Sequence, residues 1–288
     1  MISGPMTSKF VRSGRNSIVI SIFSTSSGNG KTVIAINLAA GLAKEGYAVC
    51  LMDLDLQFGD VVQYLKLDPD CTIADAQRRM ESEPESFDIT DYLTEYTHKD
   101  LKFSVMAPPK DIYDAYRIDV SMVEELIRRL NWFDFVILDL NAMFSALNLA
   151  MLDMSTIINY VGIIDFLPSV KNFKIGYDTL IRFEYEESKI RLVENRSNSQ
   201  KLIKGSDVER LVGEKFFHRL PNDFASVNRS IQAGAPLMYA APDSPLTKSF
   251  EELAGRYTNR PQSVVSPVQK VEETHPGFVS RFFNMIFH

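Results

Sequence analysis

Residues 24–32, Ser-Thr-Ser-Ser-Gly-Asn-Gly-Lys-Thr, constrain this chain more than any other segment. They follow an apolar run over 17–23 that predicts a buried strand, and they precede apolar residues at helical spacing over 33–43. A strand, a glycine-bearing loop that ends in Lys-Thr and then a helix is the arrangement of a nucleotide phosphate cradle. The sequence therefore predicts a phosphate-binding loop between the first strand and the first helix.

The chemistry of such a loop indicates its ligand. Its backbone N–H groups form an anion nest, and the helix N-terminus adds partial positive charge. We expect Lys31 to contact the β- and γ-phosphates and the Thr32 hydroxyl to bind Mg²⁺, so the expected cofactors are ATP or ADP with Mg²⁺. The expected phosphate contacts are Ser27, Gly28, Asn29, Gly30, Lys31, Thr32 and Val33.

The strict loop pattern has glycine six residues before the lysine, where this chain has Thr25. A Gly-Lys-Thr turn that binds nothing is the alternative interpretation. The flanking strand and helix argue against it, because both have the lengths and patterns that the cradle requires.

Strand-like and helix-like patterns alternate along most of the chain, and several strands are wholly apolar. Both features are typical of an α/β fold with a doubly wound, mostly parallel sheet flanked by helices. Strands are expected at 17–24, 48–53, 102–107, 133–139, 155–163, 189–193 and 215–219. Helices are expected at 31–46, 59–66, 72–80, 87–97, 111–131, 144–153, 168–186, 205–213, 222–234 and 244–258.

Length and composition indicate one large domain or one domain with appendages, because 288 residues at 45% hydrophobic content can bury a large core. We expect a disordered or vector-derived lead over 1–16, a nucleotide-binding domain over 17–259, a linker over 260–276 and a tail over 277–288. Proline, serine, valine and glutamate are frequent in the linker.

The net charge of −6 argues against binding of nucleic acid by the surface as a whole. The two cysteines, Cys50 and Cys71, indicate neither a disulfide framework nor a zinc site, which fits a reducing cytoplasm. The sequence shows no signal peptide and no apolar segment long enough to span a membrane.

Two apolar strands end in carboxylates. Asp53 and Asp55 follow the strand over 48–53, on the same side of the chain, and Asp139 ends the strand over 133–139. Ligands of α/β proteins bind at the carboxyl ends of strands, where such groups hold Mg²⁺ or orient an attacking water. The expected metal ligands are therefore Thr32, Asp55 and Asp139; the alternative for Asp55 is a capping role in the next turn.

Asn195 follows a later, more polar strand, over 189–193. A side-chain amide at this edge can recognise adenine because it offers a donor and an acceptor together. An ordinary turn at the end of the strand is the equally weighted alternative.

Together these residues resemble the MinD/ParA superfamily of P-loop ATPases, which have a deviant Walker A loop, and most of all its CpaE/TadZ pilus-assembly branch. The likeness runs from about residue 17 to about residue 257. It is carried by the loop and by the segments 53–60, 106–109, 195–196, 220–223 and 230–237.

The resemblance implies an ATP-controlled homodimer that positions a type IV (Flp/Tad-like) pilus or secretion apparatus, often at a cell pole. It implies that Lys31, Asp55 and Asp139 are catalytic, with Asp55 positioning the attacking water and Asp139 acting on Mg²⁺ through its waters. It implies that Asn195, Arg196 and Pro221 contact the base.

The chain departs from this family at two positions. Ser26 replaces a signature lysine that in the family reaches the partner's phosphates, and a cation on a transferring phosphoryl group is worth roughly 10³–10⁵ in rate. We therefore expect slow or absent hydrolysis. Asn141 stands where the family has a proline after the Walker B aspartate, so the second switch is expected to move differently.

The tail has apolar residues at 278, 279, 282, 283, 286 and 287, which would form one broad helical face. With a flexible linker this predicts a reversible membrane-surface anchor that resembles the tail of MinD-type proteins, and two tails in a dimer bind more strongly than one. Docking of the tail on its own domain or on a partner is the alternative.

Three other functions are alternatives to a positioning ATPase. A pseudo-ATPase scaffold fits Ser26. A bacterial tyrosine autokinase fits the Ser-Ser loop start, although the last tyrosine is Tyr257 and no terminal tyrosine cluster is present. A DNA-partitioning ATPase fits the loop but not the negative net charge of the chain.

Overall fold

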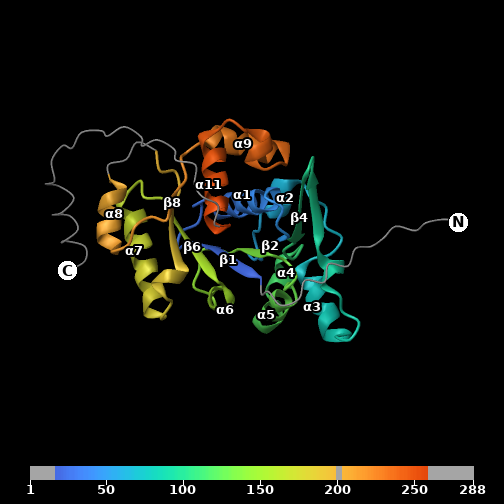
Figure 1. Ribbon diagram of the computed structural model, residues 1–288. Coiled ribbons are helices and arrows are strands. Elements are labelled where there is room, and N and C mark those ends of the chain that lie inside the picture. Colours follow the sequence, from blue (N-terminus) through green and yellow to red (C-terminus); the bar gives the residue numbers. More distant parts are fainter. Residues whose placement is uncertain (1–16, 199–202, 259–288) are drawn as a thin grey trace.

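The computed structural model describes residues 17–198 and 203–258 (Figure 1). The expected lead over 1–16, the linker over 260–276 and the tail over 277–288 lie outside the described residues. None of the described helices is long and apolar enough to cross a membrane.

One eight-stranded sheet has the order β3-β4-β2-β5-β1-β6-β7-β8. Neighbouring strands are parallel, except that β3 and β4 are antiparallel. The expected doubly wound, mostly parallel α/β fold is confirmed. The strands are β1 (Ile18–Phe23), β2 (Val49–Asp53), β3 (Thr94–His98), β4 (Leu101–Met106), β5 (Phe135–Asp139), β6 (Ile157–Gly162), β7 (Ile190–Glu194) and β8 (His218–Arg219).

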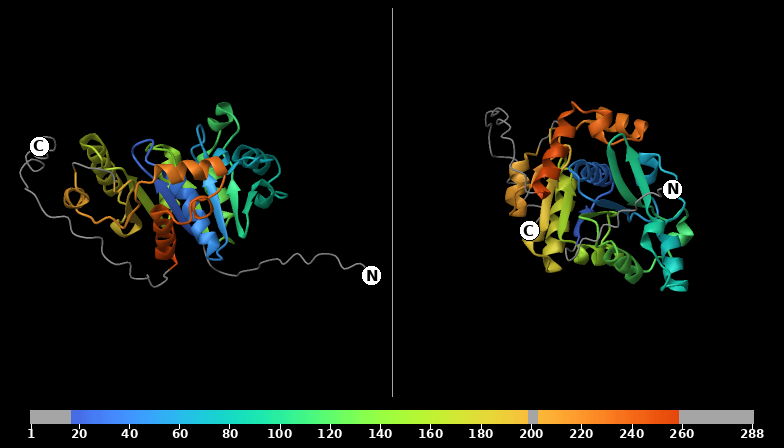
Figure 2. Two further views of the ribbon diagram at one scale, coloured as in Figure 1. Left: turned by 90° about the horizontal axis from the view of Figure 1, so that it is seen from above. Right: turned by 45° about the vertical axis from the view of Figure 1, so that its right-hand side comes forward.

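Helices cover both faces of the sheet, and the view from above has the orange and red C-terminal helices in front of it (Figure 2). One face is packed by α1, α2, α10 and α11, and the other by α3, α5, α6, α7 and α8. The helices are α1 (Lys31–Lys44), α2 (Val61–Leu65), α3 (Ile73–Ser82), α4 (Ile112–Ala115), α5 (Val120–Arg128), α6 (Ala146–Met154), α7 (Leu167–Arg182), α8 (Gly205–Val212), α9 (Phe224–Ala233), α10 (Leu237–Ala240) and α11 (Pro245–Tyr257). Short 3-10 helices span Ile89–Tyr92 and Glu187–Lys189.

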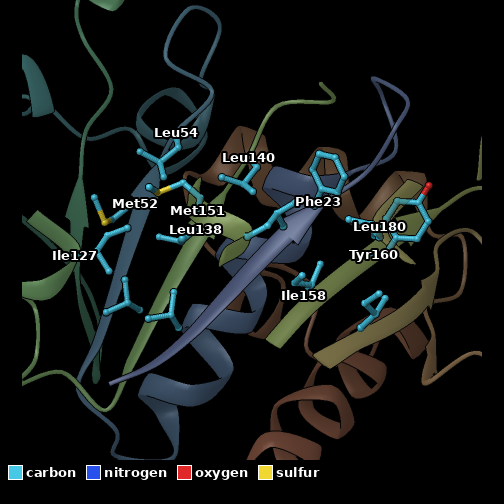
Figure 3. Packing of buried hydrophobic residues seen from close by; sticks show 14 of the residues in the cluster. Phe23, Met52, Leu54, Ile127, Leu138, Leu140, Met151, Ile158, Tyr160 and Leu180 are labelled. Atoms are coloured by element: carbon cyan, nitrogen blue, oxygen red, sulfur yellow. The ribbon is translucent and has the colours of Figure 1, made fainter. Parts of the chain in front are cut away.

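Strand β1 shows how the sequence builds two cores. Because side chains alternate along a strand, Ile20 and Ile22 pack under α1 while Val19 and Phe23 face the opposite layer. Phe23 lies near Leu140 and Tyr160 in that second core (Figure 3). This packing on both faces fixes β1 at the centre of the sheet and fixes the loop that follows it.

The helix expected over 87–97 is wrong. A 3-10 turn leads instead into β3, an antiparallel edge strand on which Tyr96 is buried while Glu95 and Thr97 are exposed. The alternation of β-favouring Thr and Tyr with a charged residue has period two, and this period outweighed the weak helical spacing.

The single helix expected over 111–131 is also wrong, because the segment forms α4 and α5. The Asp111 and Asp119 side chains each accept a backbone N–H at the start of one of these helices. Asp119 also donates its own N–H to Gln77, which fixes the break between them. Helix α10 was not expected; Asn37 of α1 accepts the N–H of Leu237 at its start.

Candidate nucleotide and magnesium site

The loop after β1 is shaped as a cradle that opens at the N-terminus of α1. Gly28 and Gly30 both have positive φ, at 74° and 82°, which favours glycine. Gly30 is the N-cap of α1, and no side chain caps the helix. The first N–H groups of this 14-residue helix are therefore available to an anionic ligand.

Thr25 anchors the start of this loop to α7. Its hydroxyl lies 2.9 Å from the Tyr160 hydroxyl and donates to the Asn172 carbonyl at 3.1 Å. Tyr160 donates to the Phe173 carbonyl, and a Cβ on Gly176 would approach the Thr25 side chain to 2.4 Å. The departure from glycine at position 25 thus serves packing against a helix that is distant in the sequence.

Asn195 lies against the loop from the end of β7. Its amide donates to the Asn29 carbonyl at 2.8 Å, and a Cβ on Gly30 would lie only 2.6 Å from the Asn195 nitrogen. Its carbonyl oxygen accepts the N–H of Arg196, which has φ of 55°. The structure therefore brings Asn195 to the phosphate loop, with one amide hydrogen already used there.

The segment that follows Asn195 pairs with the strand end that leads to Pro221. Ser197 donates its N–H to the Leu220 carbonyl, and Leu220 donates to Glu194. Pro221 is half-buried beside this pairing and Arg196 is exposed. All three expected base contacts thus follow the carboxyl ends of β7 and β8, and Asn195 is the one that contacts the loop.

Asp53 is a buried residue that holds the loop after β2 through hydrogen bonds. It is fully buried and accepts the N–H groups of Asp55 and Val61, and a Cβ on Gly59 would lie 2.4 Å from its oxygens. Burial and the neighbouring Asp139 raise its pKa well above the usual value. Asp53 therefore organises the loop and the start of α2 from a buried position, which leaves Asp55 as the more accessible of the two carboxylates.

Asp55 and Asp139 lie within the electrostatic field of Lys31. Asp55 is half-buried; burial raises its pKa, and Lys31 opposes that rise. Its carbonyl accepts the N–H of Phe58 in a turn. The structure therefore brings together Lys31, Thr32, Asp55 and Asp139, which are the residues expected to be catalytic or to hold the metal.

Asp139 is the clearest sign of a cation site. It ends β5 beside Asp53, it is 1% exposed, and neither of its carboxyl oxygens has a hydrogen-bond partner of good geometry among the described residues. Burial raises the pKa of Asp139 to about 7, a rise that Thr32 and Lys31 partly offset. A buried carboxylate without partners is costly unless a cation or its waters satisfy it.

These residues fit Mg²⁺ held together with a nucleotide. Among residues 17–198 and 203–258 no three His, Cys, Asp or Glu side chains are grouped as a metal cage. Mg²⁺ rarely uses such a cage: it keeps several waters and binds one or two carboxylates plus substrate phosphates. Thr32, Asp139 and Asp55 would hold the ion and its waters, and the ion would neutralise charge on the phosphates.

We expect Asp139 to make the binding of a nucleotide with Mg²⁺ depend on pH. Its carboxyl must ionise to act on Mg²⁺, and its raised pKa of about 7 makes the ionised fraction rise roughly tenfold between pH 6 and pH 8. We expect the gain in ATP affinity that Mg²⁺ provides to rise by about the same factor. Calorimetric titration with and without Mg²⁺ measures it.

The Asp139→Asn variant is the control for this pH dependence. In this variant, the gain in ATP affinity that Mg²⁺ provides should be small and should not change with pH. A raised folded pKa means that ionisation costs stability as pH rises toward 7, so the variant without nucleotide should also have a higher Tm at pH 8. An unchanged pH profile in the variant would contradict a role for Asp139.

Asn148 fixes the loop after Asp139. The only feature of the sequence that could have indicated this role is that Asn148 is a polar residue within an apolar helix pattern. It is fully buried, and its amide donates to both carbonyl groups of Asn141, at 3.2 and 2.8 Å, and to the Met143 carbonyl at 2.6 Å. Asn141, at the family's proline position, thus has a defined partner.

Replacement of Asn148 by alanine should loosen the loop over 140–144. Three hydrogen bonds are lost and buried acceptors are left, so the free energy of unfolding should fall by about 2–3 kcal/mol. Urea denaturation measures this loss, and Asn228→Ala on the partly exposed side of α9 is the control. Nucleotide affinity should fall as well, because Asp139 begins the loop; equal stability of both variants would refute the role.

Comparisons with known proteins identify the family of this chain. Residues 20–237 match the family model described as the CobQ/CobB/MinD/ParA nucleotide binding domain, and the chain belongs to this family. The chain is 24% identical over 261 residues to an iron-sulfur cluster carrier protein of Pyrococcus horikoshii, covering 84% of this chain and 85% of that one. It is 26% identical over 247 residues to the septum site-determining protein MinD of Thermotoga maritima, covering 83% and 87%.

Solved structures show the same fold. A ParA family ATPase from Chlorobium tepidum superposes with a TM-score of 0.75 at 22% identity, covering 83% of this chain and 98% of that one. MinD from Pyrococcus horikoshii, solved in complex with Mg-ADP, superposes with a TM-score of 0.71 at 19% identity, covering 84% and 96%.

Proposed function

We propose that this protein binds Mg-ATP in the cradle between β1 and α1 and uses the nucleotide to control a homodimer, with slow or absent hydrolysis. The observation that carries the proposal is the buried carboxylate of Asp139. Lys31 and Thr32 act on this group, and its oxygens have no hydrogen-bond partner of good geometry among the described residues. The family to which the chain belongs is a nucleotide-binding one, and a MinD neighbour was solved with Mg-ADP.

A rim of exposed apolar side chains supports dimerisation on this face. Phe58, Tyr113, Met143, Phe166 and Phe224 follow five parallel strands and are between 61% and 73% exposed. Because the carboxyl ends of parallel strands meet at one edge, these side chains surround the nucleotide edge of the sheet. Exposed apolar groups gathered in this way mark interaction sites.

Slow hydrolysis follows from the loop sequence. Ser26 is half-buried, and its carbonyl accepts the Ser24 hydroxyl, so this position offers no cation to a transferring phosphate. Binding through the backbone nest and Lys31 needs no residue at that position. The expected behaviour is that of an ATP-bound clamp with a long lifetime.

We further propose that the dimer positions a pilus or secretion apparatus from the cytoplasmic face of the membrane, with the segment 277–288 as a peripheral anchor. Its support is the resemblance of the switch and late motifs to the CpaE/TadZ branch and the apolar pattern of that segment. In the source cells, the Lys31→Ala variant should reduce surface pili as deletion does; normal piliation would contradict this role.

Iron–sulfur cluster transfer, the role named for one relative, has less support here. Such clusters are held by Cys thiolates. Cys50 is fully buried in β2, burial raises the pKa of its thiol, and Cys71 lies in a different segment. The two thiols of this sequence therefore form no exposed ligand pair in one chain.

One biochemical experiment tests the nucleotide proposal: ATP affinity in Mg²⁺, and phosphate release over hours with and without lipid vesicles. Tight binding with little release supports the clamp. Failure to bind ATP or ADP refutes the proposal, and fast release refutes the expected consequence of Ser26.

A further inference from the structure

A second cavity lies at the opposite end of β7 from the nucleotide site. It has a volume of about 450 Å³ and is lined by the start of β7, the segment before β8 and the end of α11. Ile190 and Arg191 begin β7 at this cavity, whereas Asn195 follows the other end of the strand at the phosphate loop. The cavity is thus separate from the nucleotide site.

The cavity is rich in charged groups that do not pair with one another. Arg191, Lys215 and Arg256 contribute three cations, and Glu187 and Glu214 contribute two carboxylates. No ion pair joins any two of these five groups in the described part of the chain. The lining therefore offers charge of both signs to a ligand.

The two guanidinium groups share an aromatic floor. Arg191 and Arg256 lie over the Phe217 ring, at 5.4 and 5.1 Å from its centroid. Arg256 donates to the Phe217 carbonyl, while its Nε is buried and has no partner in the described residues. Arginines held in this way are pre-organised to bind a carboxylate.

We propose that this cavity docks the segment 270–273 of the same chain, Lys-Val-Glu-Glu. Its two glutamates complement Arg191, Lys215 and Arg256, and Lys270 complements the two cavity carboxylates. Glu272 and Glu273 are the two acidic residues of the sequence between residue 259 and residue 288.

Chain length permits this docking. Arg256, near the end of α11, lines the cavity, so the cavity lies close to the point where the chain continues from α11 toward 270–273. Thirteen positions separate Thr258 from Glu272, and a random coil of that length would span about 20 Å on average. A tether of this length gives a local concentration near the millimolar range, at which a few ion pairs suffice for binding.

Docking would shorten the tether between the domain and the apolar segment 277–288. The apolar residues would then lie close to the amino-terminal end of β7 instead of reaching outward from the full linker. Release of 270–273 would lengthen their reach, which gives the site a role in setting how the segment meets a surface.

Zero-length carbodiimide cross-linking of the full chain without nucleotide tests the proposal. We expect links from Lys215 to Glu272 or Glu273, formed within one chain, as shown by mixing isotope-labelled and unlabelled protein. Lys102, which pairs with Glu95 on β3, is the internal control and should not link to either glutamate.

Charge reversal makes the test specific. Lys215 is exposed, so Lys215→Glu should leave the fold intact, remove the lysine that links and lower the links from Lys270 to Glu187 or Glu214 by about fivefold. A second reversal, Glu273→Lys, should restore the docking and give a new link between the two substituted side chains, at positions 215 and 273.

Three outcomes would overturn the proposal: no link between the cavity and 270–273, links only between different chains, or no rescue by the second reversal. Because no nucleotide is present, failure here is distinguishable from failure of the nucleotide-binding proposal.

Discussion

Replacement of Lys31 by alanine is expected to weaken Mg-ATP binding by about ten- to a hundredfold. A charge-assisted hydrogen bond contributes roughly 1.5–3 kcal/mol, and about 1.4 kcal/mol corresponds to a factor of ten in affinity. Lys31 is also the cation that acts on both Asp55 and Asp139, so its loss leaves these carboxylates unopposed. Isothermal titration of the full chain measures the effect.

The control for Lys31→Ala is Lys44→Ala at the other end of α1. Lys44 is paired with Asp100 on the surface, far along the same helix, so its replacement should leave ATP affinity within about twofold of the parent. Equal thermal unfolding of both variants separates a binding defect from a folding defect. Retained affinity in Lys31→Ala would show that the loop does not bind the nucleotide as described.

Introduction of the missing cation, Ser26→Lys, is expected to raise the rate of phosphate release by about a hundredfold or more. A cationic group on a transferring phosphoryl group is worth roughly 10³–10⁵ in rate, and a new side chain recovers only part of that. The substitution should leave ATP affinity nearly unchanged, because the backbone nest and Lys31 are intact. Single-turnover phosphate release measures it.

The matched control is Ser27→Lys, one residue along the loop, where the side chain is more exposed. A lysine at position 27 has the same charge, but its side chain leaves the loop in a different direction, so it should not accelerate phosphate release. Acceleration by both variants would indicate a general electrostatic effect. Absence of acceleration in Ser26→Lys, with dimerisation intact, would contradict Ser26 as the cause of slow turnover.

The central features of the fold were predictable because they depend on local pattern. A buried strand, a glycine loop and a helix in this order leave few alternatives, and apolar strands ending in Asp53 and Asp139 indicate which sheet edge carries the site. Errors arose where local signals compete. The segment that contains β3 has both a weak helical spacing and a period-two alternation, and its pairing with β4 favours the strand.

Other features depend on contacts between distant residues, which a single sequence does not display. Thr25 meets Tyr160 across 135 positions, and Asn37 meets Leu237 across 200. The role of Asn148 depends on the path of a loop that begins several residues earlier. Asp53 and Asp55 look equivalent in sequence, and only burial separates the structural carboxylate from the one near Lys31.

Sedimentation velocity with a fluorescent ATP analogue and Mg²⁺, recorded at protein and nucleotide wavelengths, tests nucleotide-controlled dimerisation most directly. We expect the nucleotide to sediment with the protein and the species to change from monomer with ADP to dimer with the ATP analogue. Lys31→Ala should stay monomeric without bound nucleotide. Nucleotide that stays with the solvent boundary, or one unchanged species with both ligands, would contradict the proposed clamp.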